Sequence, residues 1–517
     1  MRYPILTAEE AAALIQDGEC IGLSGFTEAG AVKVVPKAIA ERAKAEHAAG
    51  RPFKLKVMCG ASNSPIVDGE LAQADCVSMR MPYMSCPHTR SLINNAEVPY
   101  VEPHISLFAQ NMRYGIIPRV QTAIVEVCDV TDDGKLVFTM SQGSSADFCL
   151  MADRIILELN TYHKPCLADI HDIFIPEDPP NRVPIPLVAP EEKIGTPYVQ
   201  VAPEKIVGVV MNHQKDGLPH YRPNDAVTDK IGENVIKFLE REYMAGRIPP
   251  EFLPIQSGVG NVANAVLKAL GKSSIIPPVK MYTEVIQESA LELVRSGRVT
   301  FASGCSLSVS DEAMEEVYAN FDFYRDKLLL RPTEMTNNPA IVRQLGLICM
   351  NTALEADIFG NVNSTHILGS KIMNGIGGSG DFARAAAITI FSCPSVAKKG
   401  AISAIVPMVS HVDHTEHDVQ ILITEQGIAD LRGKSPRERA EIIIENCAHP
   451  DYRPLLHRYV ALSPTGHTPH SLEKAYSFHL AFKNTGDMRQ VELGYRTPSS
   501  NSGRTAVARN CGFFLHT

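Results

Sequence analysis

The sequence predicts an α/β protein in which mainly parallel sheets are covered by helices. Short apolar runs alternate with helical patterns along most of the 517 residues. With 45% hydrophobic and 21% charged residues, the composition is that of a globular protein with substantial cores. A chain of this length exceeds what one hydrophobic core sustains, so we expect it to divide into two domains.

Helix and strand signals alternate through the first half of the chain. Thr7 and Glu10 form a capping box at the start of a helix, and the apolar run 20–23 follows it as a strand. Asp133-Gly134 indicates a hairpin turn. Periodicity further predicts a helix over 33–49 and strands over 53–59, 123–127, 155–159 and 206–211.

The same alternation resumes after a Pro-rich stretch and a last strand of the first half. It predicts helices over 225–245, 261–270 and 289–296, and strands over 252–255, 279–286 and 299–302. We therefore place one domain at 1–222 and a second at 223–496. Residues 497–517 lose all apolar periodicity and are predicted to form a disordered tail.

Composition argues against several classes of partner. The formal net charge is −9 and no long Lys/Arg run is present, so nucleic acid is not an expected partner. The twelve cysteines form no C-x-x-C pair, which disfavours a zinc or redox site and indicates reduced thiols. No secretory signal and no bilayer-length apolar stretch is present, so we expect a cytoplasmic protein with no membrane partner.

Two glycine-rich segments are candidate ligand sites. Residues 374–381 contain a literal G-x-G-x-x-G, but the next acidic residue after Asp381 is Asp413, too far for the ribose contact of a dinucleotide site. The segment can still bring backbone N–H groups close to a developing anion, or it can simply form a tight turn. The second segment, 256–266, follows a predicted strand at the carboxyl edge of a parallel sheet, where ligands bind.

Three further patterns allow both a functional and a structural interpretation. Glu284 is a lone carboxylate in the apolar strand pattern 281–287, and it either faces solvent or a cation, or serves as a nucleophile. After a predicted strand over 401–409, His411 and His414 flank Asp413, but no H-E-x-x-H accompanies them, so a hydrogen-bonded loop is favoured over a metal site. Ser24 lacks the G-x-S-x-G context of a hydrolase elbow.

Taken together, these segments resemble the acetyl-CoA hydrolase/CoA-transferase family, most closely the succinyl-CoA:acetate CoA-transferases. The matching pieces occur in the family's order from the first helix to about residue 452. They are residues 24–27, 256–266, 283–287, 360–365, 374–384, 405–407 with 411–414, and 424–427.

The resemblance implies two CoA-transferase-type (NagB/RpiA-like) α/β domains, with CoA bound mostly by the second. It implies that Glu284 is the nucleophile, that Asn337 and Gly378 stabilise the oxyanion, and that Glu425 is a second active-site carboxylate. CoA is then a substrate, with no tightly bound cofactor and no metal, and the protein is a homodimer. The implied CoA contacts are Gly258, Val259, Gly260, Asn261, Val262, Leu354, Asn374, Gly378 and Lys398.

The resemblance implies transfer of CoA between an acyl-CoA (succinyl-, acetyl- or propionyl-CoA) and a small carboxylate such as acetate or succinate. Two alternatives stay open: a thioesterase, in which water resolves the glutamyl-CoA, and a non-catalytic acyl-CoA-binding protein. The stretch 212–217 lacks the arginines of resembling succinate-using members, although Arg222 is close by.

Overall fold

The computed structural model describes residues 2–63, 65–218 and 224–494 of the chain. Its first half forms a nine-stranded sheet with the order β1-β9-β7-β5-β2-β3-β4, and β6 and β8 extend it beside β5. All pairs along the main path are parallel, and β6 and β8 pair antiparallel. The strands are β1 (Ile5–Leu6), β2 (Cys20–Leu23), β3 (Leu55–Cys59), β4 (Val77–Met81), β5 (Thr122–Val130), β6 (Lys135–Phe138), β7 (Arg154–Asn160), β8 (Val199–Gln200) and β9 (Ile206–Asn212).

Helices cover both faces of this sheet, as the sequence predicts. On β5, Ala123 and Val125 pack into one core while Ile124 packs into the other, because successive strand side chains point to opposite faces. The first core includes Phe108 of α5 and the second includes Ile39 of α2. The helices are α1 (Ala8–Ala13), α2 (Val35–Ala48), α3 (Asp68–Gln73), α4 (Pro87–Asn94), α5 (Ile105–Arg113) and α6 (Ser145–Met151).

The second half forms an eight-stranded sheet with the order β15-β13-β11-β10-β16-β21-β25-β26, parallel except for the β25–β26 pair. Its strands are β10 (Ile255–Ser257), β11 (Val279–Tyr282), β13 (Val299–Gly304), β15 (Leu328–Leu330), β16 (Ile348–Thr352), β21 (Ile388–Ser392), β25 (Ile421–Thr424) and β26 (Gly427–Asp430). The helices around it are α7 (Ala226–Met244), α8 (Asn261–Lys272), α9 (Glu288–Arg295), α10 (Asp311–Ala319), α11 (Phe321–Tyr324), α12 (Thr333–Thr336), α13 (Pro339–Leu345) and α14 (Ser379–Ala383).

Three strand predictions are wrong in detail. The predicted strand 279–286 breaks after Tyr282, and its second part, β12 (Val285–Gln287), pairs with β14 (Ser306–Ser308) in a separate two-stranded sheet. The predicted strand 252–255 begins only at Ile255, since Phe252 has a positive φ of 60° and Pro254 precedes the strand. The predicted strand 401–409 is reduced to β23 (Ile402–Ser403) and β24 (Ile405–Val406), which join different sheets.

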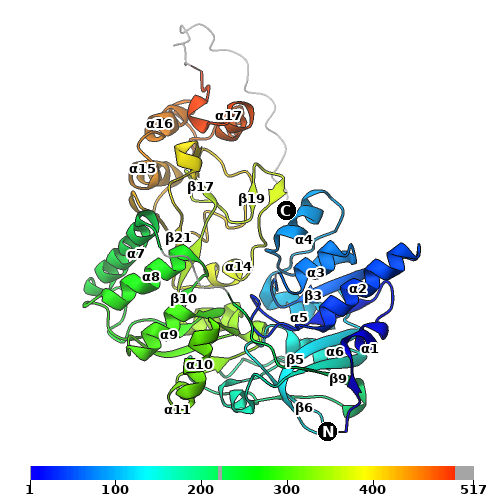
Figure 1. The fold of residues 1–517 in the computed structure, drawn as a ribbon. Coiled ribbons are helices and arrows are strands. Elements are labelled where there is room, and N and C mark those ends of the chain that lie inside the picture. The colour runs from blue at the N-terminus through cyan, green and yellow to red at the C-terminus, as the bar shows by residue number, and fades with distance from the viewer. Residues whose placement is uncertain (1, 64, 219–223, 495–517) are drawn as a thin grey trace.

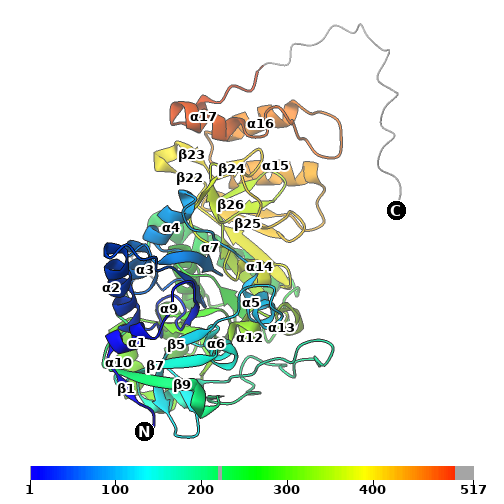
Figure 2. The same cartoon turned by 90° about the vertical axis from the view of Figure 1, so that its right-hand side faces the viewer.

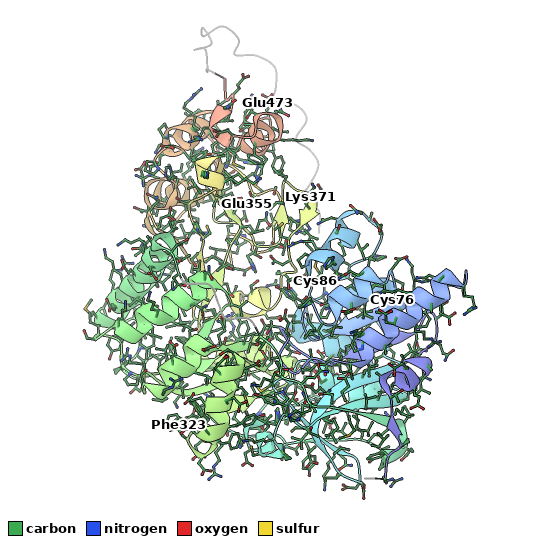
Figure 3. All side chains as sticks on the ribbon, viewed as in Figure 1. Cys76, Cys86, Phe323, Glu355, Lys371 and Glu473 are labelled. Carbon is green, nitrogen blue, oxygen red and sulfur yellow. The ribbon has the colours of Figure 1, made fainter. Side chains whose placement is uncertain are left out.

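The C-terminal part of the second half forms an upper lobe (Figures 1 and 2), and its hydrophobic core also includes Phe391, Leu422 and Ala429 of the second sheet. Glu355, labelled in Figure 3, lies inside it and accepts hydrogen bonds from Ser410 N (2.7 Å), Asn363 Nδ2 (2.9 Å) and His479 Nε2 (2.8 Å). Its other elements are β17 (Glu355–Asp357), β18 (Val362–Asn363), β19 (His366–Ile367), β20 (Lys371–Ile372), β22 (Val396–Ala397), α15 (Pro436–Cys447), α16 (Arg453–Ala461) and α17 (Ser477–Thr485).

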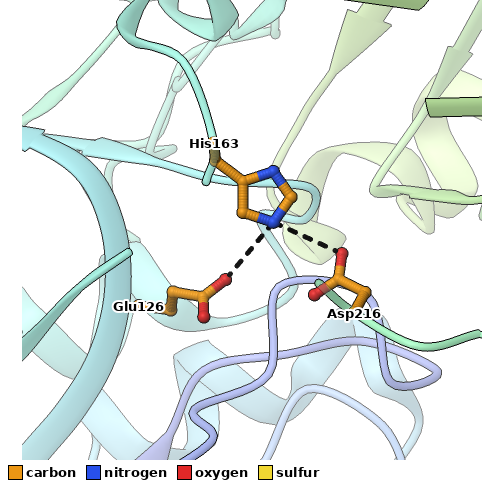
Figure 4. Close-up of side chains that lie close together, drawn as sticks. All are labelled: Glu126, His163 and Asp216. Atoms are coloured by element: carbon orange, nitrogen blue, oxygen red, sulfur yellow. Dashed lines mark ion pairs between the residues drawn. The ribbon is translucent and has the colours of Figure 1, made fainter. Parts of the chain in front are cut away.

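A buried ionic cluster connects the first sheet to the second half of the chain. Figure 4 shows the His163 imidazole between the carboxylates of Glu126 and Asp216, with its Nε2 3.8 Å and 3.6 Å from their oxygens. The Lys33 ammonium lies 2.6 Å from Glu126 Oε2 and 2.8 Å from Asp216 Oδ1, so it takes the position that a bound cation would occupy. His163 Nδ1 is 2.9 Å from the Tyr318 hydroxyl on α10, which ties the cluster to the second half.

The strands of the two large sheets come from residues 5–212 and 255–430. The predicted boundary after residue 222 and the predicted tail 497–517 both fall outside the described residues. Across residues 2–494, apart from the gaps at 64 and 219–223, none of the helices combines the length and apolarity needed to cross a bilayer.

Candidate active site

A cavity of about 180 Å³ lies between loops of the first half and the carboxyl ends of strands in the second half. The segments 256–259 and 351–354 each comprise the last two residues of a strand, β10 and β16, and the two residues that follow it. The carboxyl edge of the second sheet therefore forms one wall, where ligands of parallel sheets bind. The glycine-rich segment 374–379 forms another wall. The remaining lining residues are Phe26, Thr27, Ala61, Tyr83, Ile105, Glu284, Val285 and Ser364.

Glu284 stands at the break between β11 and β12, and its side chain lines the cavity. Its backbone carbonyl accepts a hydrogen bond of 2.7 Å from Cys305 N, which fixes the chain at the break. Its carboxylate accepts a hydrogen bond of 2.7 Å from Asn337 Nδ2. Ending the strand at this point therefore presents the carboxylate to the cavity instead of burying it between layers.

Burial raises the pKa of Glu284 to about 7, the hydrogen bond from Asn337 opposes this shift, and the negative charge of Asp381 adds to it. The charged form is disfavoured because the site is poorly solvated. Glu284 is thus a carboxylate with little hydration whose ionised form becomes available near neutral pH. A strongly perturbed pKa in a cavity is typical of a functional group.

Asn337 follows α12 and is fully buried. Thr336 Oγ1 donates a 2.8 Å hydrogen bond to Asn337 Oδ1, which leaves the amide nitrogen directed at Glu284. The short helix itself is held by the Tyr282 hydroxyl, which donates to Met335 O over 2.7 Å. The orientation of the Asn337 amide is therefore set by its neighbours.

Gly378 approaches the Glu284 carboxylate so closely that any side chain would collide with it. A Cβ built on Gly378 would lie 2.5 Å from Glu284 Oε1 and 2.9 Å from Glu284 Cδ, and it would lie closer still to Asn337 Nδ2. Real Cβ atoms do not make contacts this short, so a larger residue here would have to displace the loop or the side chains of Glu284 and Asn337. The structure thus brings Glu284, Asn337 and Gly378 into direct contact from three separate segments.

Except for Lys398, the residues predicted to bind CoA divide into two groups. Gly258, Val259, Leu354, Asn374 and Gly378 line the cavity, and Val259 and Leu354 are exposed apolar side chains there. The other predicted residues on the same turn, Gly260, Asn261 and Val262, start α8 directly after the cavity wall, with Gly260 at a positive φ of 101°.

Lys398 and Glu425 are placed outside the residues that line the cavity. The Lys398 ammonium lies over the Phe482 ring of α17, 5.0 Å from its centre. The Glu425 carboxylate accepts hydrogen bonds from Ser395 N (2.8 Å), from Ser395 Oγ, and from Gln426 Nε2 (3.0 Å). In this conformation both side chains contact structural neighbours and not Glu284.

Two patterns noted in the sequence, Ser24 and the segment 411–414, contact residues that hold loops of the fold. Ser24 is buried, donates to Gly30 O (3.0 Å) and accepts from Glu126 N (2.8 Å), so its hydroxyl holds a loop. His414 is buried and its Nε2 lies 3.1 Å from the hydroxyl of Ser379, a cavity residue, and burial lowers its pKa to about 4. His411 Nε2 lies 3.3 Å from Asp413 Oδ1. This segment supports the glycine-rich wall of the cavity.

Sequence reasoning missed the polar residues of the first half that hold the glycine-rich wall. Glu102 accepts a hydrogen bond from Ile376 N, and Asp381 accepts hydrogen bonds from Ser106 N (3.0 Å) and Ser106 Oγ (2.6 Å). These partners are more than 270 residues apart in the chain. No local spacing signals such a contact, and only the fold brings the two segments together.

The chain matches models of a known protein family. The description "Acetyl-CoA hydrolase/transferase N-terminal domain" matches residues 2–211, and "Acetyl-CoA hydrolase/transferase C-terminal domain" matches residues 314–460. The chain belongs to the acetyl-CoA hydrolase/transferase family. The resemblance seen in the sequence is thereby confirmed.

Relatives within the acetyl-CoA hydrolase/transferase family align over nearly the whole chain. The propanoyl-CoA:succinate CoA transferase of Escherichia coli is 46% identical over 93% of this chain and 98% of its own length. The succinyl-CoA:acetate CoA-transferase of Clostridium kluyveri is 46% identical over 95% of this chain and 91% of its own. The acetyl-CoA hydrolase of Candida glabrata is 38% identical over 94% of this chain and 95% of its own.

Solved structures confirm the predicted fold class. RipA from Yersinia pestis superposes with a TM-score of 0.68 at 23% identity, covering 88% of this chain and 96% of that one. The 4-hydroxybutyrate CoA-transferase of Porphyromonas gingivalis superposes with a TM-score of 0.61 at 20% identity, covering 89% of this chain and 97% of that one. At these identities the likeness shows the fold alone.

Proposed function

We propose that this protein is a CoA-transferase that moves CoA from a short-chain acyl-CoA to a small carboxylate through a glutamyl-CoA thioester on Glu284. The observation that carries this proposal is the contact of the Glu284 carboxylate with both Asn337 Nδ2 and the side-chain-free face of Gly378 inside one cavity. A nucleophile next to fixed hydrogen-bond donors is the arrangement that acyl transfer needs.

The reaction proceeds in four displacements that conserve the thioester. The Glu284 carboxylate attacks the acyl carbonyl, CoA thiolate leaves, and an acyl-glutamyl anhydride forms. The thiolate then attacks the glutamyl carbonyl, which releases the first carboxylate and leaves glutamyl-CoA. The acceptor carboxylate attacks the glutamyl carbonyl and expels thiolate, and the thiolate attacks the new acyl carbonyl, which frees Glu284 and the product acyl-CoA.

A carboxylate is a weak nucleophile, so these displacements require low hydration of Glu284, donors to the oxyanion and binding energy from CoA. The cavity provides all three. Phe26, Ile105 and Val285 belong to one apolar cluster beside Glu284 and limit its hydration. The Asn337 amide and the Gly378 N–H are the donors to the tetrahedral oxyanions, each worth about 3 kcal/mol in such sites. Contacts of CoA along 258–262, with Leu354 and with Asn374, supply binding energy used at the reacting carbonyl.

The relatives' names indicate which substrates to test. One relative is named for propanoyl-CoA and succinate, another for succinyl-CoA and acetate, so acetyl-, propionyl- and succinyl-CoA are the donors to test with acetate, propionate and succinate as acceptors. Lys398 and Glu425 stay predicted participants in CoA binding and catalysis. Their involvement requires the ligand-bound protein to bring them toward the cavity.

Hydrolysis is the second candidate function, because the relative from Candida glabrata is named an acetyl-CoA hydrolase. Transfer and hydrolysis separate in one assay that follows acyl-CoA consumption and product acyl-CoA with and without a carboxylate acceptor. We expect consumption to depend on the acceptor and to yield one new acyl-CoA per donor used. CoA release at an undiminished rate without acceptor, and with no product acyl-CoA in its presence, would replace transfer by hydrolysis.

The pH dependence of transfer follows from the nucleophile. We expect kcat/KM for acyl-CoA to rise with pH and to level off above about 7, since Glu284 attacks only when ionised and burial raises its pKa to about 7. Tyr83 and Cys305 face Glu284 but stay neutral in this range, because burial raises their pKa values, that of Tyr83 to about 12.

The matched variant for this profile is Asp381→Asn. It removes a negative charge that raises the pKa of Glu284, so the midpoint of the profile should move to lower pH. A wild-type profile that is flat between about pH 5.5 and 8, or a midpoint unmoved by the variant, would contradict the assignment.

The remaining proposals concern location and assembly. We propose a cytoplasmic location, because the cysteines among the described residues are free and all but Cys166 are buried. The homodimer and the absence of nucleic-acid partners stay predictions, and light scattering on the purified protein with and without nucleic acid tests both.

A further inference from the structure

The glycine-rich segment 375–378, here called the glycine loop, has few side chains that could stabilise its own conformation. It contains Gly375, Gly377 and Gly378, and Gly377 has a positive φ of 61°. Glycine loses more conformational freedom on ordering than any other residue, and it offers no side chain to pack. The contact between Gly378 and Glu284 therefore depends on groups outside the loop.

Glu102 of the first half lies directly behind this loop. Its Oε1 accepts a hydrogen bond from Ile376 N, in the middle of the loop, and lies 3.0 Å from the Tyr100 hydroxyl. A Cβ on Gly375 would collide with Glu102 Oε1 and lie 2.8 Å from a ring carbon of Tyr83, so the loop backbone is seated against these side chains. Burial raises the pKa of Glu102 to about 7, while the N–H groups of Ile376 and Gly377 favour its ionised form.

A second contact holds the end of the same loop. Asp381, three residues after Gly378, accepts two hydrogen bonds from Ser106, and Ser106 lies four residues after Glu102. The short segment 102–106 of the first half therefore contacts the chain on both sides of Gly378, the residue of the loop that approaches Glu284 most closely. Neither carboxylate lines the cavity, so neither is in a position to touch the substrate directly.

We propose that Glu102 is a positioning residue for transfer: it fixes the glycine loop through Ile376 N, and thereby sets the distance between Gly378 and the Glu284 carbonyl at which the oxyanion forms. This inference rests on the proposed function and adds a residue from the opposite half of the molecule to it. It implies that catalytic competence requires the correct docking of the two halves, since the first half supplies the support for an oxyanion donor of the second.

Glu102→Ala removes the acceptor and is expected to lower kcat for transfer about 100-fold, the cost typical of a misplacement near 1 Å at a reacting centre. Glu102→Gln keeps an oxygen that can accept from Ile376 N, so its kcat should stay within about tenfold of wild type. Glu102→Asp keeps the charge but withdraws it by one methylene, so it should resemble the alanine variant. Glu97→Ala, an exposed glutamate shortly before this segment, is the matched control and should behave as wild type.

The readouts separate positioning from a merely structural role. Rates are expressed per active site, counted by the amount of CoA adduct formed at saturation, and thermal unfolding is recorded for each variant. A structural role would lower the unfolding temperature and the number of active sites while kcat per site stayed unchanged. A positioning role predicts an unchanged unfolding temperature and an unchanged number of active sites, with a lower kcat per site. The adduct should then form slowly but completely.

Two results would overturn the inference: wild-type kcat per site in Glu102→Ala, or equal losses in Glu102→Gln and Glu102→Ala. If the alanine variant fails to fold, the comparison of Glu102→Asp with Glu102→Gln decides, and a wild-type rate in Glu102→Asp overturns it. Failure of the proposed function looks different, because then the wild-type protein itself shows no transfer or retains transfer after loss of Glu284.

Discussion

Glu284→Ala is expected to abolish CoA transfer. Removal of a nucleophile that acts through a covalent intermediate costs on the order of 10⁴- to 10⁶-fold in kcat, because the remaining donors have no attacking group to assist. The fold should survive, since burial raises the pKa of Glu284 to about 7 and its ionised form is therefore disfavoured in the folded protein. Transfer is measured as new acyl-CoA formed from a donor and a carboxylate acceptor.

Glu284→Gln is the matched control for this loss. It keeps the size of the side chain and an oxygen for the hydrogen bond from Asn337 Nδ2, so it preserves the packing of the site without a carboxylate. We expect it to be as inactive as the alanine variant while binding CoA with unchanged affinity. Normal transfer by either variant, with unfolding temperatures like the wild type, would end the assignment of Glu284 as nucleophile.

Gly378→Ala is expected to lower kcat by roughly 10²- to 10³-fold, the cost of losing an oxyanion donor or misplacing the reacting group. The added methyl group would stand 2.5 Å from Glu284 Oε1 and 2.9 Å from Cδ, so either the loop or the carboxylate must move. The measurement is steady-state kcat together with the rate of adduct formation in a single turnover.

Gly69→Ala serves as the control for this substitution. Gly69 lies in helix α3, where a Cβ would meet its nearest neighbour at an ordinary 3.5 Å, and alanine suits a helix better than glycine. It should leave kcat unchanged. A Gly378→Ala protein with wild-type kcat would show that the close approach to Glu284 does not matter for the reaction.

Most of the architecture could be predicted from local patterns. The capping box at Thr7 and Glu10, the strand 20–23 and the helix starting after Asp225 occur where the sequence placed them. These elements depend on apolar periodicity and on side chains that cap their own helix, both of which are local properties. The two sheets covered by helices follow from the alternation of these elements.

The predicted strand 279–286 shows a limit of structure prediction from local sequence patterns. Its apolar alternation is continuous, yet the chain leaves the main sheet after Tyr282 and joins β14 from Val285 onward. The break depends on pairing with residues 306–308 and on the hydrogen bond from Cys305 N to Glu284 O, which no window of the sequence contains. The same break moves Glu284 from a strand interior to a cavity wall, and so changes its interpretation from structural to chemical.

The candidate site was predictable only where one segment carries the signal. The glycines at 375–380 and the carboxylate at 284 are visible in the sequence, and the family resemblance linked them. Glu102 and Ser106 carry no signal of their own, because their role comes from contacts with residues about 275 positions away. The position of Lys398 over Phe482 likewise depends on how α17 packs in the upper lobe.

The most direct test of this account is the mass of the protein after incubation with acyl-CoA in the absence of an acceptor, followed by borohydride reduction and peptide mapping. The account predicts an adduct of one CoA less one water per active site, and its reduction to an alcohol at residue 284. The adduct should be absent from Glu284→Gln. A protein that is active in transfer but carries no modification at residue 284, or carries it at another residue, would contradict the covalent mechanism.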